Sequence, residues 1–469
     1  MSSLPITPGR LLDFPADPLA CMRALHRQHG DVAALEEGRQ RIAFVFSPEL
    51  NQQVLTDTET FHSRFFAIAG PRNSAQRRVT SGLLSMNGQE HKRHRRMVIG
   101  PFQRKAIAGY HGQLVELVEE MLSAWRPGQV RNIFADMKQF MLRVTSAILF
   151  GLDQPEIAFE VGHLMEEWVE QNHRLGVAAL VPVEHQQEDY MRLLGIAEQV
   201  EARIVKMIEL KRAAGATGSD VLSLLLRAYD DDGHGMTDAE LIGQAAILYG
   251  AAHLTTTNSL SWALFLLAQH PHTMRELHGE LSPLAGDPPA LEQLDQLPVL
   301  QRVVDESLRV LTPSAYSQRL TVEPAQLGPL KLGRATVVVF SQYLTHHRPD
   351  LFEDPDCFVP DRWRSIKPSP YAYLPFGAGP RMCLGATLAL TTIKLALATI
   401  LGRYRLTVQP GAQIDGHVLS TMLTPTSGMP MIVSHADGRC EASPVTGNIH
   451  SLVKLDESLV APERLRIAA

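Results

Sequence analysis

One cysteine near the C-terminal end lies in a glycine-rich turn that directly precedes a long apolar segment. Residues 374–385 read LPFGAGPRMCLG, and the cysteine is Cys383. A thiol at the start of a helix has a lowered pKa, because the helix dipole and the free backbone N–H groups stabilise the thiolate. Such a thiolate is either a nucleophile or a metal ligand, and its neighbours decide between these roles.

The residues around Cys383 favour a ligand to the metal of a flat cofactor. Phe376 offers an apolar ring to cover the sulfur, Gly385 permits a close backbone approach, and Arg381 offers a planar cation for a carboxylate. The other three cysteines are scattered, which argues against a cysteine-built zinc or iron–sulfur site. A lone thiolate beside an arginine fits a porphyrin, with sulfur on iron and arginine on a propionate. The alternative is a cysteine that packs as a small hydrophobic residue.

The spacing Phe-x-x-Gly-x-Arg-x-Cys-x-Gly resembles the haem-binding signature of the cytochrome P450 family at every fixed position. The resemblance implies haem b, with the Cys383 thiolate as axial ligand of the iron and with Phe376, Arg381 and Gly385 beside the cofactor. It also implies a mainly α fold with minor β-sheets. In that fold the haem lies between a long distal helix and the proximal coil that carries the cysteine.

The composition is that of an ordinary globular protein. The 469 residues are 45% apolar and 20% charged, and neither a linker nor a repeat divides them. We expect one haem domain over residues 1–435 and a C-terminal extension of unassigned role over residues 436–469. A net charge of −6 does not favour nucleic acid as a partner. The N-terminal residues lack an apolar run long enough for a membrane anchor or a signal peptide, so we expect a cytoplasmic protein.

Helical spacing of apolar residues dominates the chain. It predicts helices over residues 111–126, 135–150, 190–213, 238–269, 290–310 and 384–401. Shorter β-branched or alternating runs predict strands over residues 40–46, 317–322, 335–341, 404–408 and 429–434. Many helices with a minor sheet agree with the cytochrome P450 resemblance.

A second motif is the pair Glu306 and Arg309, spaced to face each other on one helix. Alone this spacing is weak evidence, because a solvated surface pair has the same form. The pair precedes the FVPDRW segment at residues 358–363, which resembles the Phe-x-Pro-x-Arg-Phe segment of the family. The resemblance implies a buried network of Glu306, Arg309 and Arg362 that locks the coil beneath the haem.

A third motif is the basic run HKRHRR at residues 91–96, where His91 and Arg95 share one helix face. The plain interpretation is a solvated basic face. The resemblance implies instead that His91 and Arg95 bind a haem propionate, as the His-x-x-x-Arg pair of bacterial members does. Arg319 resembles a further propionate arginine. Together with Arg381 these cations suit the two carboxylates of a haem.

The long predicted helix departs from the family pattern. The oxygen-binding motif Ala-Gly-x-Asp/Glu-Thr-Thr corresponds here to AAHLTT at residues 251–256. The resemblance assigns catalytic positions to Ala251, which keeps space above the iron, and to Thr255, whose hydroxyl organises oxygen. The alternative is an ordinary buried helix whose threonines bond the carbonyl four residues earlier.

Leu254 stands where the family has an acid, and a leucine cannot relay protons. Three interpretations follow. Protons reach oxygen through water held by Thr255, fed by His253 or another polar group. The substrate supplies a polar group. Or the enzyme uses peroxide or rearranges an oxidised substrate. His253 is one helical step from Leu254, so it could equally face away from the haem.

The resemblance implies a monooxygenase that inserts one atom of O2 into a hydrophobic small molecule, by hydroxylation or epoxidation. Terpenoids, fatty acyl chains, steroids and polyketides all suit the apolar residues at the substrate-contact positions of the family, which are Phe65, Phe66, Leu248, Ala252, Pro313, Tyr316 and Met422. Electrons are expected from NAD(P)H through a separate reductase and a ferredoxin. The alternatives are a peroxide-driven or non-oxidative haem-thiolate enzyme, favoured by Leu254, and a haem-binding sensor without turnover.

Overall fold

The structure is a computed structural model and describes residues 4–64, 68–178 and 186–456. The predicted pocket residues Phe65 and Phe66 lie outside the described residues. The helices are α1 Asp13–Ala16, α2 Pro18–His29, α3 Pro48–Thr56, α4 Ala75–Val79, α5 Gly88–Val98, α6 Arg104–Ser123, α7 Ile133–Phe150, α8 Pro155–Ala178, α9 Gln186–Ala213, α10 Val221–Leu226, α11 Asp238–Gln269, α12 Pro271–Leu281, α13 Leu291–Leu294, α14 Pro298–Val310, α15 Gln342–His346 and α16 Ala386–Arg403.

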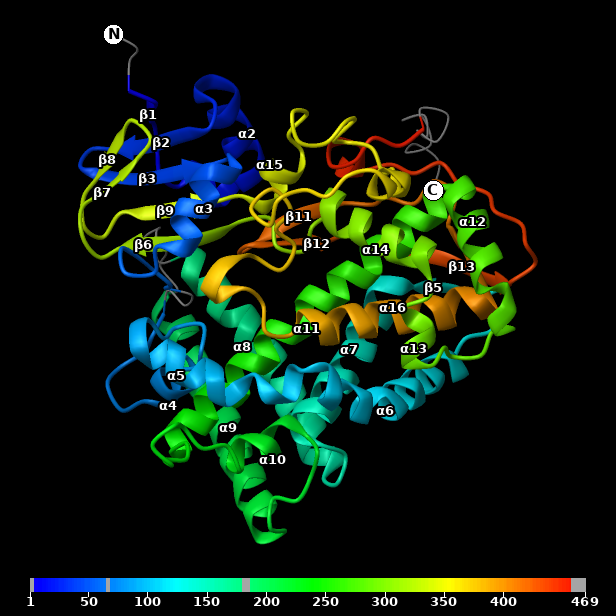
Figure 1. Ribbon diagram of the computed structural model, residues 1–469, viewed down its shortest axis with the longest axis horizontal. Coiled ribbons are helices and arrows are strands. Elements are labelled where there is room, and N and C mark those ends of the chain that lie inside the picture. The colour runs from blue at the N-terminus through cyan, green and yellow to red at the C-terminus, as the bar shows by residue number, and fades with distance from the viewer. Residues whose placement is uncertain (1–3, 65–67, 179–185, 457–469) are drawn as a thin grey trace.

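The strands form small sheets beside the helices (Figure 1). They are β1 Ile6–Pro8, β2 Val32–Glu37, β3 Gln40–Val45, β4 Phe61–His62, β5 Val130–Asn132, β6 Ser317–Thr321, β7 Ala325–Leu327, β8 Leu330–Leu332, β9 Val337–Phe340, β10 Tyr404–Val408, β11 Gly416–Leu419, β12 Met422–Pro425 and β13 Pro430–His435. The largest sheet has the order β1-β2-β3-β9-β6-β4, and a three-stranded sheet has the order β10-β13-β5. Hairpins β7–β8 and β11–β12 each form a separate two-stranded sheet. The expectation of a mainly α fold with minor sheets is confirmed.

Helix α11 runs through the centre of the helical part (Figure 1), over the range that the sequence predicts. Its first turn is fixed by a capping box, in which the Thr237 hydroxyl and the Glu240 carboxylate each accept from the backbone N–H of the other residue. Pro271 starts the next helix directly after it. Most of α11 is buried on all sides, which is typical of a core helix. Residues at its middle are therefore held at the centre of the protein.

Among the described residues, α16 is the one helix long and apolar enough to cross a membrane. It is 61% buried against other elements, as expected for the core helix of a folded protein. It starts three residues after Cys383, so burial of α16 anchors the cysteine turn.

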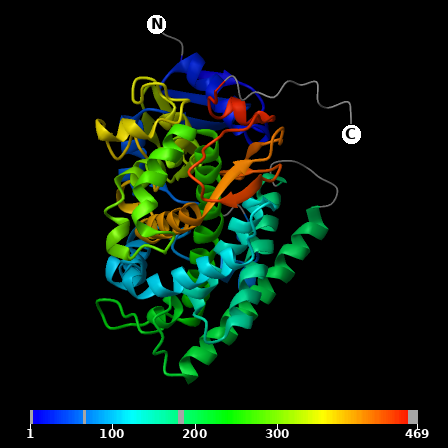
Figure 2. The same ribbon diagram turned by 90° about the vertical axis from the view of Figure 1, so that its right-hand side faces the viewer.

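One predicted helix needs revision, and the structure adds detail on the C-terminal extension, whose role stays unassigned. The helix predicted over residues 290–310 is two helices, α13 and α14, because Pro298 cannot continue a helix and begins a new one instead. The segment after residue 435 is packed in the structure as far as residue 456, with Val445, Ile449 and Val453 almost fully buried. Figure 2 shows this segment against the body of the protein, and α9 as the outermost rod on that side.

Candidate functional site

Cys383 lies between a short 3-10 turn, Gly379–Arg381, and the start of α16. Its backbone N–H donates to the carbonyl oxygen of Phe376 at 2.8 Å, which closes the loop beneath the thiol. Gly379 has φ +71°, and a Cβ there would lie 2.8 Å from the carbonyl oxygen of Leu55, so only glycine fits. The sequence of this turn therefore fixes where the sulfur points.

Cys383 is exposed in the structure, and the protein groups near it act on its thiol in opposite directions. Desolvation raises the pKa of the thiol, while the backbone N–H of Gly385 and the guanidinium of Arg95 act to lower it. The family's thiolate ligand would thus have two protein groups that favour its charged form. Bound iron would stabilise the thiolate further.

Four basic side chains gather near this turn: His91 and Arg95 on α5, Arg319 on β6, and Arg381. Desolvation and the charges of Arg381, Arg95 and Arg319 lower the pKa of His91 to about 4. Desolvation, and then the charge of a neighbouring arginine, lowers the pKa of both Arg319 and Arg381 to about 10. The structure thus brings together all four residues that the sequence predicts as propionate ligands.

Each of the three arginines is held by uncharged groups. Arg381 donates to the carbonyl oxygen of Met86 and, at 2.8 Å, to Oδ1 of Asn87. Arg95 donates to the carbonyl oxygen of Met382, and Arg319 to that of Gln318, both at 2.8 Å. Within the described part of the chain none of the three has a carboxylate partner. Converging cations without a counter-anion fit the two propionates of a haem.

The middle of α11 presents small and polar residues. Ala251 is exposed, and Leu248, Ala252, Leu254 and Thr255 are partly exposed, although most of the helix is buried. Ala251 and Thr255 lie one turn apart on the same face. This stretch of α11 therefore offers accessible surface, with little bulk at Ala251, Ala252 and Thr255.

A model of the family described as "Cytochrome P450" matches residues 8–429. The chain belongs to the cytochrome P450 family. A "Cyclooctat-9-en-7-ol 5-monooxygenase" of Streptomyces melanosporofaciens is 32% identical over 82% of this chain and 84% of that protein. A "Pentalenene oxygenase" of Streptomyces avermitilis is 28% identical over 87% of this chain and 91% of that protein. The solved structure of cyanobacterial CYP120A1 bound to retinoic acid covers 92% of this chain and 100% of its own, with a TM-score of 0.80 and 22% identity, and shows the shared fold.

As a cytochrome P450 the protein is an oxidoreductase whose cofactor is haem with a cysteine thiolate as axial ligand. The residues present fit that cofactor: an accessible thiol in the signature turn and a set of cations without a counter-anion. The individual residue roles stay predictions.

His253 does not share the face of Thr255 in this cytochrome P450. Its side chain is buried, and its ring stacks on that of Tyr249 with 5.9 Å between the ring centroids. Its Nε2 lies 3.8 Å from Oε1 of Glu166. Lys138 pairs with the same carboxylate. Desolvation and the charge of Lys138 lower the pKa of His253 to about 4. This geometry favours the interpretation in which His253 faces away from the haem and does not feed protons to Thr255.

The structure brings Glu306, Arg309 and Arg362 together in one buried network. The Glu306 carboxylate accepts from Nε and Nη2 of Arg309 at 2.9 and 2.8 Å, and from Nε of Arg362 at 3.0 Å. Arg309 also donates to three backbone carbonyls, of His346, Pro355 and Cys357. Neither Glu306 nor Arg309 has exposed side-chain area. The network binds α14 to the coil that leads to the cysteine turn.

The predicted pocket residues from the late part of the chain have unequal surroundings. Met422 is partly exposed, whereas Pro313 and Tyr316 are buried. The Tyr316 hydroxyl donates to the carbonyl oxygen of Ser420 at 2.6 Å, and its ring centroid lies 5.0 Å from that of Phe14. Tyr316 therefore packs and joins two segments, and its contact with substrate stays a prediction.

Two positioning residues did not follow from the sequence. Trp363 donates its indole N–H to Oε2 of Glu306 at 2.9 Å, and Asn87 holds Arg381. The only hint was that Trp363 replaces the phenylalanine of the family segment.

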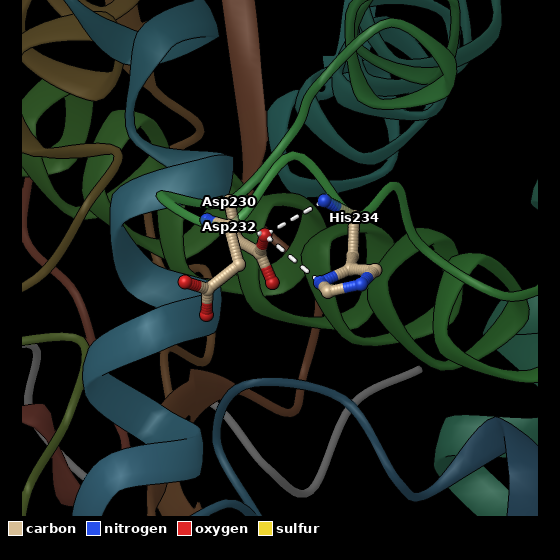
Figure 3. Close-up of side chains that lie close together, drawn as sticks. All are labelled: Asp230, Asp232 and His234. Atoms are coloured by element: carbon tan, nitrogen blue, oxygen red, sulfur yellow. Dashed lines mark hydrogen bonds and ion pairs between the residues drawn. The ribbon is translucent and has the colours of Figure 1, made fainter.

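A cluster of Asp230, Asp232 and His234 in the loop before α11 has the composition of a metal site (Figure 3). Asp230 already accepts from the backbone N–H groups of Asp232 and His234 at 3.1 and 2.8 Å and from Arg93 at 2.7 Å. The backbone of His234 and the Arg93 side chain lower the pKa of Asp230 to about 2. Arg93 also pairs with Glu240 at 3.2 Å, so the loop fastens α5 to the start of α11.

Proposed function

We propose that this cytochrome P450 is a monooxygenase that hydroxylates or epoxidises a cyclic terpenoid. The names of two relatives that match more than four fifths of the chain carry the substrate class: one names a cyclooctatenol and the other pentalenene. The partly exposed apolar residues Leu248, Ala252 and Met422 suit a hydrocarbon skeleton. Neither of these two names points to a fatty acyl, steroid or polyketide substrate.

Cys383 would hold the haem iron, and His91, Arg95, Arg319 and Arg381 would hold the propionates. When bound and reduced, the haem supplies the activation of O2. The protein's own part is to orient the substrate and to deliver protons. The small side chains of Ala251 and Ala252 leave room beside α11, and the Thr255 hydroxyl donates to the carbonyl oxygen of Ala251, which leaves its oxygen free to accept from a water or a hydroxyl.

Protons would then come from water and not from an acid on α11. Leu254 carries none, and His253 faces Glu166 on the other side of the helix. Electrons would come from NAD(P)H through a ferredoxin and its reductase in the cytoplasm, as in the bacterial members that the chain resembles.

The test is to reconstitute the haem-loaded protein with a ferredoxin, its reductase and NADPH and to supply pentalenene and related cyclic terpene hydrocarbons under 18O2. The expected result is a haem spin-state shift on binding and a product with one 18O atom. Failure of the whole panel to shift the spin state or to be oxidised would contradict the terpenoid assignment.

Leu254 favours a second candidate, a peroxide-driven enzyme that needs no relay of protons to bound oxygen. Product formed with hydrogen peroxide, together with none from the reductase system, would support this candidate and contradict the first. Haem binding without turnover under either condition would leave the sensor interpretation.

A further inference from the structure

The C-terminal segment beyond the family match is part of the folded core. The family model ends at residue 429, whereas the structure is packed as far as residue 456. Val445 and Ile449 have no exposed area, and Leu452 and Val453 have 3% and 1%. The segment runs beside residues 412–416, with backbone hydrogen bonds from Ile414 N–H to Thr446 O at 2.8 Å and from Thr446 N–H to Ala412 O at 2.9 Å.

Asn448 in this segment holds the first residue of hairpin β11–β12. Its Oδ1 accepts from the backbone N–H of Gly416 at 2.8 Å, and its Nδ2 donates to the carbonyl oxygen of Gly416 at 2.9 Å. The backbone N–H of Asn448 donates to the Asp415 carboxylate at 2.7 Å. One side chain thus satisfies both backbone groups of Gly416, as a neighbouring strand would.

The contact at Gly416 is tight on its other side. A Cβ at this position would lie 2.8 Å from Cδ1 of Leu452 and 3.1 Å from the ring of Trp262 on α11. The hairpin is therefore enclosed between the C-terminal segment and the distal helix, and a displacement of the segment would move the hairpin.

The other strand of the hairpin is bonded to α11 close to Thr255. Asn258, three residues after Thr255 and on the same side of the helix, donates to Oγ1 of Thr424 at 3.0 Å. Trp262 donates to the carbonyl oxygen of Leu423 at 3.0 Å. Strand β12 also bonds the segment after α14, through Leu423 N–H to Pro313 O at 3.0 Å. The hairpin carries Met422, a residue predicted to contact substrate.

We propose that the C-terminal segment 443–456 sets the position of the β11–β12 hairpin over the distal face of α11, with Asn448 as its positioning residue. The proposal assigns this segment a part in substrate selection, and it rests on the proposed function only for the chemical class of the substrate. Loss of the two side-chain bonds to Gly416 should let the hairpin move without disturbing Cys383, which takes no part in these contacts of the hairpin.

The experiment compares Asn448→Ala and Asn448→Asp with the wild type, all haem-loaded. The aspartate keeps the acceptor for Gly416 N–H and loses the donor to Gly416 O. Glu441→Gln, at an exposed site of the same part of the chain, is the matched control. Hydrogen exchange of residues 416–425 and the affinity for 4-phenylimidazole, a ligand of haem iron, are measured in each, with the terpene panel alongside.

Exchange of residues 416–425 is expected to be about tenfold faster in Asn448→Ala, with a smaller increase in Asn448→Asp and none in Glu441→Gln. The 4-phenylimidazole affinity and any terpene product ratios should change in the same order, while the reduced CO spectrum stays that of the wild type. Unchanged exchange in the hairpin, or faster exchange spread over the whole chain, would overturn the proposal. If no terpene binds even to the wild type, the proposed function fails, while the exchange and 4-phenylimidazole measurements still test the hairpin.

Discussion

The hydroxyl of Thr255 donates to the carbonyl oxygen of Ala251 at 2.8 Å, one turn earlier on α11. The same pattern continues along the helix, from Thr257 to His253 and from Ser259 to Thr255. A hydroxyl that donates its hydrogen in this way can still accept a hydrogen bond from a water molecule. Thr255 thus has the bond that an ordinary buried threonine makes and the free acceptor that an oxygen-organising threonine needs.

We predict that Thr255→Ala lowers the fraction of NADPH used for product formation severalfold, because no hydroxyl then orders water beside the haem. His253→Gln should leave that fraction unchanged, since His253 contacts Tyr249 and Glu166 on another face. Product, NADPH and hydrogen peroxide are measured together in the reconstituted system. Equal coupling in Thr255→Ala and the wild type would remove Thr255 from the mechanism.

The reduced CO spectrum tests the ligand assignment. Cys383→Ala should lose the absorption band that gives the cytochrome P450 family its name, because that band needs a thiolate on iron. Cys440→Ala is the matched control, since Cys440 lies after strand β13, beside His278 of α12. A retained band in Cys383→Ala would refute the assignment.

The three arginines that surround His91 repel one another and should therefore bind an anion such as a haem propionate. Arg381→Met is expected to weaken haem retention at least tenfold, because one propionate loses its charge-assisted partner. In the haem-free protein the same change should raise the pKa of His91 above about 4, since Arg381 is the strongest charge acting on it. Haem titration and NMR titration of His91 measure the two effects.

The control for that experiment is Arg96→Met, on the same helix, where an exposed arginine already pairs with Asp231 at 3.0 Å. It should retain haem as the wild type does. Equal haem loss in Arg381→Met and Arg96→Met would show that the cluster has no special role.

The parts of the fold that follow from local sequence signals could be predicted. The bounds of α11 follow from the Thr237–Glu240 capping box and from Pro271, which lie at its two ends. That Glu306 and Arg309 face each other follows from their spacing on one helix, although this spacing alone does not distinguish a buried pair from a solvated one. In each case the deciding residues are neighbours in the chain.

Contacts between distant segments could not be predicted in this way. The bond from Trp363 to Glu306 spans 57 residues, and that from Asn448 to Gly416 spans 32. The β11–β12 hairpin was missed because its strands have four residues each, and its turn uses Ser420 at φ +61° where a glycine would have been the usual signal. Likewise, the direction of His253 depended on what α7 and α8 place beside it.

The buried carboxylate of Glu306 should contribute strongly to the free energy of unfolding. Glu306→Gln leaves Arg309 and Arg362 without a countercharge, and we expect the free energy of unfolding to fall by about 3–5 kcal/mol. Trp363→Phe removes one donor to the same carboxylate and should cost about 2 kcal/mol. Urea unfolding of the haem-loaded protein measures both.

Glu209→Gln is the matched control for the carboxylate, because Glu209 pairs with Lys206 at 3.9 Å on an exposed helix face. Its effect should stay under about 0.5 kcal/mol. A Glu306→Gln variant as stable as Glu209→Gln would contradict the structural role of the network.

The buried imidazole of His253 should make the protein sensitive to acid. Burial and the charge of Lys138 hold its pKa at about 4 in the folded protein, below the 6.5 of an exposed histidine. The unfolded chain therefore binds the proton first, and this group's contribution to stability, complete above pH 6.5, is lost as the pH falls to 4. The loss is about 3 kcal/mol by pH 4. His253→Gln should remove this loss of stability, so that the free energy of unfolding, measured with urea at each pH, falls less steeply than in the wild type.

His234→Gln, at an exposed loop position, is the matched control and should follow the wild-type curve. Parallel curves for His253→Gln and the wild type would show that His253 is not held neutral by its surroundings.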